Sequence, residues 1–161
     1  SFGLPSPLSF GEGQGVRQII IDPWTQTPAF TIGSNAYDVN YDLQGNVYIY
    51  GGQLLYNYQL IKMDSTGAVK WIYSYTNITS MHGYGDFAVD ENTGTSYLIG
   101  YKPEVNVFKI NTAGMQVATF AGNNQMNEMW RMEYNNCTKE IIIGSGGTSD
   151  KNQFLRLDTT M

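Results

Sequence analysis

Residues 36–52 read AYDVNYDLQGNVYIYGG, and the same pattern returns twice along the chain. The second copy is YGDFAVDENTGTSYLIGY (84–101) and the third is WRMEYNNCTKEIIIGSG (130–146). Each copy has an alternating segment, a polar turn, a run of β-branched or aromatic residues, and then glycine. This order is typical of two antiparallel strands joined by a tight turn. An internal repeat is stronger evidence for the fold than any single predicted strand, so the chain is interpreted as an array of one repeated unit.

The units are evenly spaced. The turn residues Asp42, Asp90 and Asn135 are 48 and 45 residues apart. Each unit later carries a second pattern around a basic residue, and these basic residues are 47 residues apart in both intervals. The second patterns are LIKMD (60–64), VFKIN (107–111) and FLRLD (154–158), with Lys62, Lys109 and Arg156. A period near 47 falls in the range of four-stranded propeller blades.

The predicted fold is therefore all-β: a β-propeller of about three consecutive four-stranded antiparallel blades, forming a partial propeller. The glycines Gly51, Gly100 and Gly144 are expected to close the second strand of each unit. Residues 1–17 are expected to be a tail or linker, and the blades to occupy residues 18–161. The expected divisions are a half blade at 18–33, blades at 36–75 and 84–120, and a partial blade at 129–161.

A partial ring has consequences for assembly, because a blade buries its two faces only against its neighbours. Two explanations stay open. Either the chain is a fragment of a longer propeller, or it completes a ring by association with further blades of the same or another chain, for example as a homo-oligomer.

Composition restricts the class of partner. Hydrophobic residues make up 42% of the chain and charged residues only 14%, with a net charge of −5. The absence of a basic cluster argues against nucleic acid and against an anionic membrane surface as partners. No apolar run approaches the length of a membrane span, so membrane insertion is not expected. The single cysteine, Cys137, excludes an intrachain disulfide.

The stretch YDLQGNVYIYGG (41–52), followed by YQLIKMDSTGAVKWIYSY (58–75), resembles the bacterial β-propeller repeats of the SBBP and NHL type. The second part is also similar to the repeat of pyrroloquinoline-quinone propellers, with Trp71 after Gly67. The resemblance covers about residues 19–158 and weakens after the first unit, since Ala118 stands where a second tryptophan is expected. It implies an exported or cell-surface protein, extracellular or periplasmic, that serves as a binding module or scaffold.

The innermost strand of each blade lines the central channel of a propeller. Aligning the three units places Asp38, Asp86 and Arg131 in one ring and Tyr37 and Trp130 in the ring before it. These side chains are candidates for binding a polar ligand or a cation in a central funnel. The alternative is that they only satisfy one another's charges and hydrogen bonds.

Other motifs are weaker. His82 and Tyr84, in the loop before Asp86, are further funnel candidates. A lone histidine does not make a metal site, and no nucleophile motif is present, so neither a metal, a cofactor nor a catalytic residue is predicted. Short glycosylation patterns occur in four places, two of them N-linked and two resembling the O-linked sites of exported Bacteroidetes proteins. Their acceptors are Asn77, Asn136, Ser65 and Thr159.

Three functions are compatible with these features. The leading one is a non-catalytic binding or scaffold module of an exported bacterial protein, which presents loops and a central funnel to a protein or glycan partner. The second is a fragment of a propeller enzyme, such as a quinoprotein-like dehydrogenase or a lyase. The third is a structural repeat in a surface layer or filament.

Overall fold

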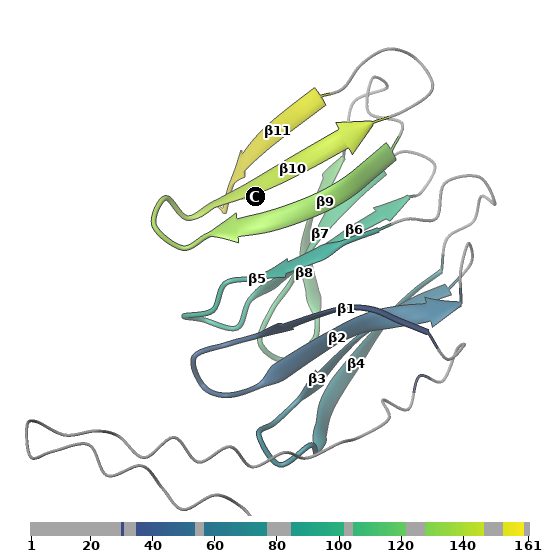
Figure 1. Ribbon diagram of the computed structural model, residues 1–161, viewed down its shortest axis with the longest axis vertical. Coiled ribbons are helices and arrows are strands. Elements are labelled where there is room, and N and C mark those ends of the chain that lie inside the picture. Colours follow the sequence, from purple (N-terminus) through teal and green to yellow (C-terminus); the bar gives the residue numbers. More distant parts are fainter. Residues whose placement is uncertain are drawn as a thin grey trace, which may run out of the picture.

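The computed structural model describes residue 30 and residues 35–53, 57–76, 85–101, 105–121, 128–146 and 153–159. The regular structure in this part of the chain is all β-strand, which confirms the prediction of an all-β fold (Figure 1). The described residues include no helix with the length and apolarity needed to cross a membrane. The expected tail at 1–17 and half blade at 18–33 lie outside the described residues, apart from Phe30.

The strands form three antiparallel sheets, each connected in simple sequence order. The first sheet contains β1 (Asn35–Tyr41), β2 (Val47–Gln53), β3 (Asn57–Met63) and β4 (Val69–Thr76). The second contains β5 (Phe87–Val89), β6 (Ser96–Tyr101), β7 (Val105–Ile110) and β8 (Gln116–Ala121). The third contains β9 (Glu128–Asn135), β10 (Glu140–Gly146) and β11 (Gln153–Asp158).

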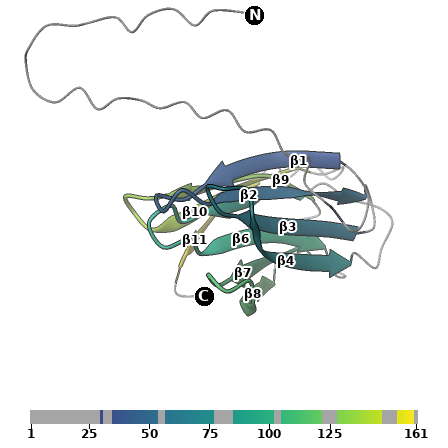
Figure 2. The ribbon, with the colours of Figure 1, turned by 90° about the horizontal axis from the view of Figure 1, so that it is seen from below.

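The three sheets are stacked in a row and do not close on themselves (Figure 1). Seen from below, β1 and β9 lie at one edge of the stack, whereas β4 and β8 lie at the opposite edge (Figure 2). The first strands of the sheets thus share one edge of the stack, and residues at equivalent positions on those strands come near one another.

The tight turn after each first strand is built by one side chain. The Asp42 carboxylate accepts hydrogen bonds from the backbone N–H groups of Gln44 and Asn46, at 3.1 and 2.9 Å. Asp90 and Asn135 begin the equivalent turns in the other two sheets. Asx residues favour such turns because their side chains replace a backbone acceptor. The repeated turn residue therefore marks the turn in all three sheets. The strand registers agree in the second and third sheets, whereas the first turn is one residue shorter.

Each of these turns also needs one residue with a positive φ. Gly45 and Gly94 supply it in the first two sheets, with φ of 81° and 76°. In the third sheet the position is held by Lys139, with φ of 59°. A side chain in this left-handed region is strained, so the third turn keeps its geometry in spite of its sequence.

The expected equivalence of the three strand-closing glycines is wrong for the third sheet. Phe87 pairs with Leu98 in the second sheet, and Met132 pairs with Ile143 at the corresponding place in the third. Gly144 therefore occupies the position of Ile99, not that of Gly100. The third sheet keeps the register of the second, but its glycine follows the turn residue after nine residues instead of ten.

The first and second sheets enclose an aromatic core. Tyr48, Tyr50 and Leu60 of the first sheet are at most 1% exposed and pack against Phe87 and Leu98 of the second. Burying side chains of this size contributes roughly 1.5–3 kcal/mol each. The face between these two sheets is therefore a principal source of stability.

The second and third sheets enclose a more aliphatic core. Ile99 and Val107 of the second sheet pack with Met132, Ile141 and Ile143 of the third. Each of these side chains is no more than 4% exposed. The second sheet is thus covered on both faces, and all three residues of β5 are buried.

Glycine lets the sheets approach closely at Gly100, where an added Cβ would lie 2.9 Å from the Tyr75 ring of the first sheet and 2.4 Å from Phe108. Gly51 is in the same situation on the outer face of the first sheet, since its added Cβ would lie 2.5 Å from the Phe30 ring. Phe30 therefore covers Gly51 as Tyr75 covers Gly100. An aromatic ring therefore packs against a glycine at the outer face of the first sheet and again between the first and second sheets.

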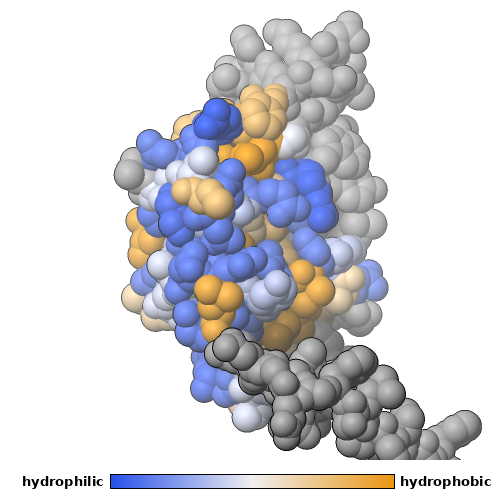
Figure 3. All heavy atoms as spheres, turned by 60° about the vertical axis from the view of Figure 1, so that its left-hand side comes forward, coloured by the Kyte–Doolittle hydropathy of each residue, from blue (hydrophilic) through white to orange (hydrophobic). Residues whose placement is uncertain are grey.

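The outer face of the third sheet is open. An added Cβ at Gly144 would meet nothing within 4 Å, and Phe154 is 64% exposed. Leu60 and Val107, at the positions equivalent to Phe154, are fully buried. On the side of the molecule drawn in Figure 3, hydrophobic residues form small separate groups among hydrophilic ones.

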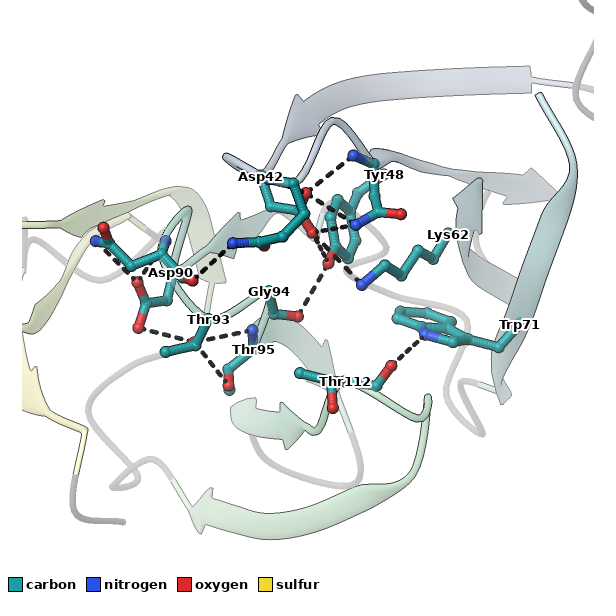
Figure 4. A network of polar contacts seen from close by, with 12 residues as sticks. Asp42, Tyr48, Lys62, Trp71, Asp90, Thr93, Gly94, Thr95 and Thr112 are labelled. Carbon is teal, nitrogen blue, oxygen red and sulfur yellow. Dashed lines mark hydrogen bonds and ion pairs between the residues drawn. The ribbon is translucent and has the colours of Figure 1, made fainter. Parts of the chain in front are cut away.

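A polar network joins the first two sheets on their turn side (Figure 4). The Tyr48 hydroxyl lies 2.8 Å from the Asp42 carboxylate and 3.0 Å from the Gly94 carbonyl, and Lys62 lies 3.4 Å from the same carboxylate. Burial raises the pKa of Asp42, but hydrogen bonds from Asn46 and Tyr48 outweigh it, so the pKa lies below its usual value. This buried carboxylate is fully partnered and has a structural role.

Candidate functional site

Asp38, Asp86 and Arg131 hold the same position in their three sheets. Each precedes by four residues the Asx residue of its turn, and two of them lie on the first strands β1 and β9 while Asp86 directly precedes β5. Stacking the sheets at a common register brings these positions together at one edge. The side-chain group formed by Asp38, Asp86 and Arg131 is called the tri-sheet cluster below.

The tri-sheet cluster is held by ion pairs across the sheets. The Arg131 guanidinium lies 3.9 Å from the Asp38 carboxylate and 3.8 Å from the Asp86 carboxylate. A third carboxylate, that of Glu133, lies 3.7 Å from it. These separations exceed the 2.7–2.9 Å of a direct charge-assisted hydrogen bond, so the contacts are loose.

Burial differs sharply within the cluster. The Asp86 side chain is 5% exposed, that of Asp38 is 30% exposed, and that of Arg131 is 67% exposed. Asp86 thus forms the floor of the cluster, whereas Asp38 and Arg131 form its solvent-facing rim.

Asp86 is also a link between sheets. Its carboxylate accepts a hydrogen bond of 2.7 Å from the backbone N–H of Met132, on β9 of the third sheet. Burial, with a smaller contribution from the Asp38 carboxyl, raises the pKa of Asp86 to about 6 against the opposing hydrogen bonds from the backbone N–H groups of Met132 and Phe87. A second negative charge beside Asp38 is costly there, and Asp86 carries a proton over part of the mildly acidic range.

Tyr50 lies on β2 under this cluster. It pairs with Asp38 in the strand register, and its hydroxyl would lie 2.7 Å from a Cβ added to Gly85, the residue before Asp86. The side chain is 1% exposed, and its hydroxyl has no hydrogen-bond partner in the described part of the structure. Burial raises the pKa of Tyr50 well above its usual value, with a contribution from the Asp86 charge, so the hydroxyl stays protonated.

A hollow of about 380 Å³ opens beside the rim. Its described lining is mainly apolar and consists of Ala36, Tyr37, Asp38, Val39 and Ile49. Tyr37 is 41% exposed, and its ring centre lies 6.1 Å from that of Tyr50. The hollow falls in the size range of small-ligand pockets. Its apolar residues Val39 and Ile49 face the outer side of the first sheet, because they alternate along their strands with Asp38 and Tyr50.

The structure brings together four of the seven residues predicted to bind a ligand, namely Tyr37, Asp38, Asp86 and Arg131. Trp130 lies on β9, next to Arg131, and its side chain is outside the described part. His82 and Tyr84 fall outside the described residues, as does the glycosylation candidate Asn77.

The other glycosylation candidates lie in or beside turns. Ser65 is exposed between β3 and β4, and Asn136 is half-buried between β9 and β10, where its side chain accepts a hydrogen bond from Asn92. Thr159 follows β11, and its carbonyl accepts a hydrogen bond from Lys109 of the second sheet.

Sequence reasoning missed Tyr50 and Glu133. The sequence signal for Glu133 is its place two residues after Arg131, because alternate residues of a strand point to the same face. Tyr50 had no such signal, since only strand pairing shows that it lies opposite Asp38.

The chemistry available to the cluster is charge recognition. Within the described residues, no group of three or more histidine, cysteine, aspartate or glutamate side chains is placed to hold a metal ion. What the site offers is two neighbouring carboxylates, one exposed guanidinium and a buried hydroxyl. No protein-family model and no curated protein sequence matches the chain.

Proposed function

We propose that the protein is a non-catalytic binding or scaffold module of an exported protein, and that its sheets are consecutive blades of a β-propeller. In this proposal the edge shared by the first strands faces the central channel. The tri-sheet cluster then lies at the mouth of this channel, where a protein or glycan partner is recognised.

One observation carries the proposal: three residues about 45–48 positions apart in sequence meet at a single point, one from each sheet. Repeat arrays commonly bind partners through a surface composed of equivalent positions on successive units. Arg131 at the rim is exposed and Asp38 is partly exposed, while Asp86 at the floor is held by a hydrogen bond from the Met132 backbone N–H. A rigid floor with an accessible rim is what a preorganised binding site requires.

The proposal of an exported location depends on composition and on the resemblance to bacterial propeller repeats. The low content of charged residues and the many tyrosine and glycine residues fit that class. Further blades, from the same chain or another one, would cover the open face that contains Gly144 and Phe154.

The proposal is tested by arrays of oligosaccharides and peptides probed with the purified chain. We expect reproducible binding to one class of compound, and loss of that binding in the double variant Asp38→Asn, Arg131→Ala. The matched control is Arg156→Ala, which removes an exposed arginine on β11 that pairs with Glu140 instead. Binding that survives the double variant would place the recognition surface elsewhere and overturn the proposal.

A further inference from the structure

We infer that a second copy of this chain packs the outer face of its third sheet onto the outer face of the first sheet. In this contact the exposed Phe154 of one copy enters the hollow beside Val39 and Ile49 of the other. The inference goes beyond the proposed function, because it concerns a surface separate from the tri-sheet cluster.

The first and third sheets form the two ends of the row (Figure 1). Each interface within the row joins one sheet to the sheet that follows it along the chain. The third sheet ends the row with the face that the first two sheets turn towards their successors. The first sheet begins the row with the face that the other two turn towards their predecessors. Stacking the third sheet of one copy on the first sheet of another therefore repeats an interface that the chain already contains twice.

Phe154 is the residue that would reach across this contact. Leu60 and Val107 hold the equivalent position on the third strands of the first two sheets. Both are fully buried in the core that their sheet shares with the next one, whereas Phe154 is 64% exposed. Burying an apolar side chain of this size contributes roughly 1.5–3 kcal/mol, so the exposed ring favours a partner.

Val39 holds the receiving position on the first sheet. Phe87 and Met132 are its equivalents in the second and third sheets, because each pairs with the equivalent residue of the second strand. Phe87 lies in the core that contains Leu60, and Met132 lies in the core that contains Val107. Both equivalents are 2% exposed, whereas Val39 is 62% exposed. The receiving position is thus filled in both internal interfaces and open on the first sheet.

The sizes of the two open positions are complementary. Phe154 is the largest of the three residues at its position, and Val39 is the smallest of the three at the receiving position. The hollow of about 380 Å³ lies beside Val39 and is also lined by Ile49. The hollow leaves room for the larger ring, and filling it adds dispersion contacts that neither surface has alone.

Phe30 gives separate evidence that the first sheet receives a neighbour on this face. It lies 45 residues before Tyr75, and its ring covers Gly51 as the Tyr75 ring covers Gly100. Tyr75 belongs to the sheet that precedes Gly100 in the row. Phe30 therefore has the place of a residue from a preceding sheet, and it leaves Val39 exposed on the same face.

The test is sedimentation equilibrium of the full chain from micromolar to millimolar concentration. We expect the mass to rise with concentration from 18.0 kDa to at least twice that value. Phe154→Glu and Val39→Glu should each abolish the rise, because a charge buried in an apolar contact is costly. Met115→Glu is the matched control: this residue is 59% exposed in the turn between β7 and β8, and its variant should associate as the wild type does.

Mixing the two variants distinguishes this contact from any other. The Val39→Glu chain keeps an intact third sheet and the Phe154→Glu chain keeps an intact first sheet, so an equimolar mixture should form dimers held by one contact. Recovery of dimers in the mixture also shows that both variants are folded.

A wild type that keeps a mass of 18.0 kDa up to millimolar concentration would overturn the inference. Single variants that associate like the wild type, or a mixture without dimers, would do the same. If the chain is monomeric but an array compound binds in an Asp38- and Arg131-dependent manner, this inference fails and the proposed function stands. If the chain associates as expected but no array compound binds, the inference stands and the proposed function fails.

Discussion

Replacing Asp86 by asparagine should make the fold more stable at neutral pH, although the residue sits at the junction of the three sheets. A carboxyl whose pKa is higher in the folded protein than in the unfolded chain binds its proton more tightly when folded. Its ionisation therefore opposes folding. This cost is absent below pH 4, grows as the pH rises towards 6, and is fully present above pH 6.

The magnitude follows from the shift. The pKa of Asp86 rises from 3.8 to about 6. Each unit corresponds to about 1.4 kcal/mol, so the cost of ionisation at pH 8 has an upper value of roughly 3 kcal/mol. In Asp86→Asn the amide oxygen can still accept the hydrogen bond from Met132, and the amide N–H can donate to Asp38 as the protonated carboxyl does. We expect a gain of roughly 1–3 kcal/mol at pH 8 and almost none at pH 4.

Urea unfolding at a series of pH values, followed by circular dichroism, measures this difference. Asp38→Asn is the informative companion, because removing the neighbouring carboxylate should lower the pKa of Asp86 and reduce the pH dependence of the wild type. A stability difference between Asp86→Asn and wild type that stays constant from pH 4 to pH 8 would refute the reasoning. So would a wild type that is the more stable of the two at pH 8.

Four further substitutions test the packing. Gly100→Ala should destabilise the fold by about 1–3 kcal/mol because its Cβ would overlap packed rings, whereas Gly144→Ala, with nothing within 4 Å, should leave the melting temperature unchanged. Lys139→Gly should stabilise the fold by up to about 1 kcal/mol, because it removes the backbone strain of a side chain at a φ of 59°. A lower urea midpoint in this variant would show that the contacts of the lysine side chain contribute more than the strain costs. Trp71→Phe should lower the free energy of unfolding by about 1 kcal/mol, because it removes the hydrogen bond from the indole N–H to the Thr112 carbonyl. An unchanged melting temperature would show that this hydrogen bond does not contribute to stability.

The tri-sheet cluster was partly predictable. Its three members share one offset from the turn residues Asp42 and Asp90 and from Asn135, so counting along the repeats aligns them without coordinates. Side chains along a strand point alternately to its two faces, and residues at the same offset from the turn therefore point to the same face in each repeat. Counting failed at Gly144, because one residue fewer separates this glycine from its turn residue than separates Gly100 from Asp90, and a shift of one residue moves a side chain to the opposite face.

The sequence by itself determined the class of fold and the unit that is repeated, because turn chemistry and strand alternation act between residues near one another in the chain. Only the tertiary structure decided that Asp86 is buried, that the Tyr50 hydroxyl has no hydrogen-bond partner among the described residues, and that Arg131 contacts carboxylates from two other sheets only loosely. These properties depend on distances between separate sheets and on how much water the stacking excludes, and neither quantity is set by any single stretch of the chain.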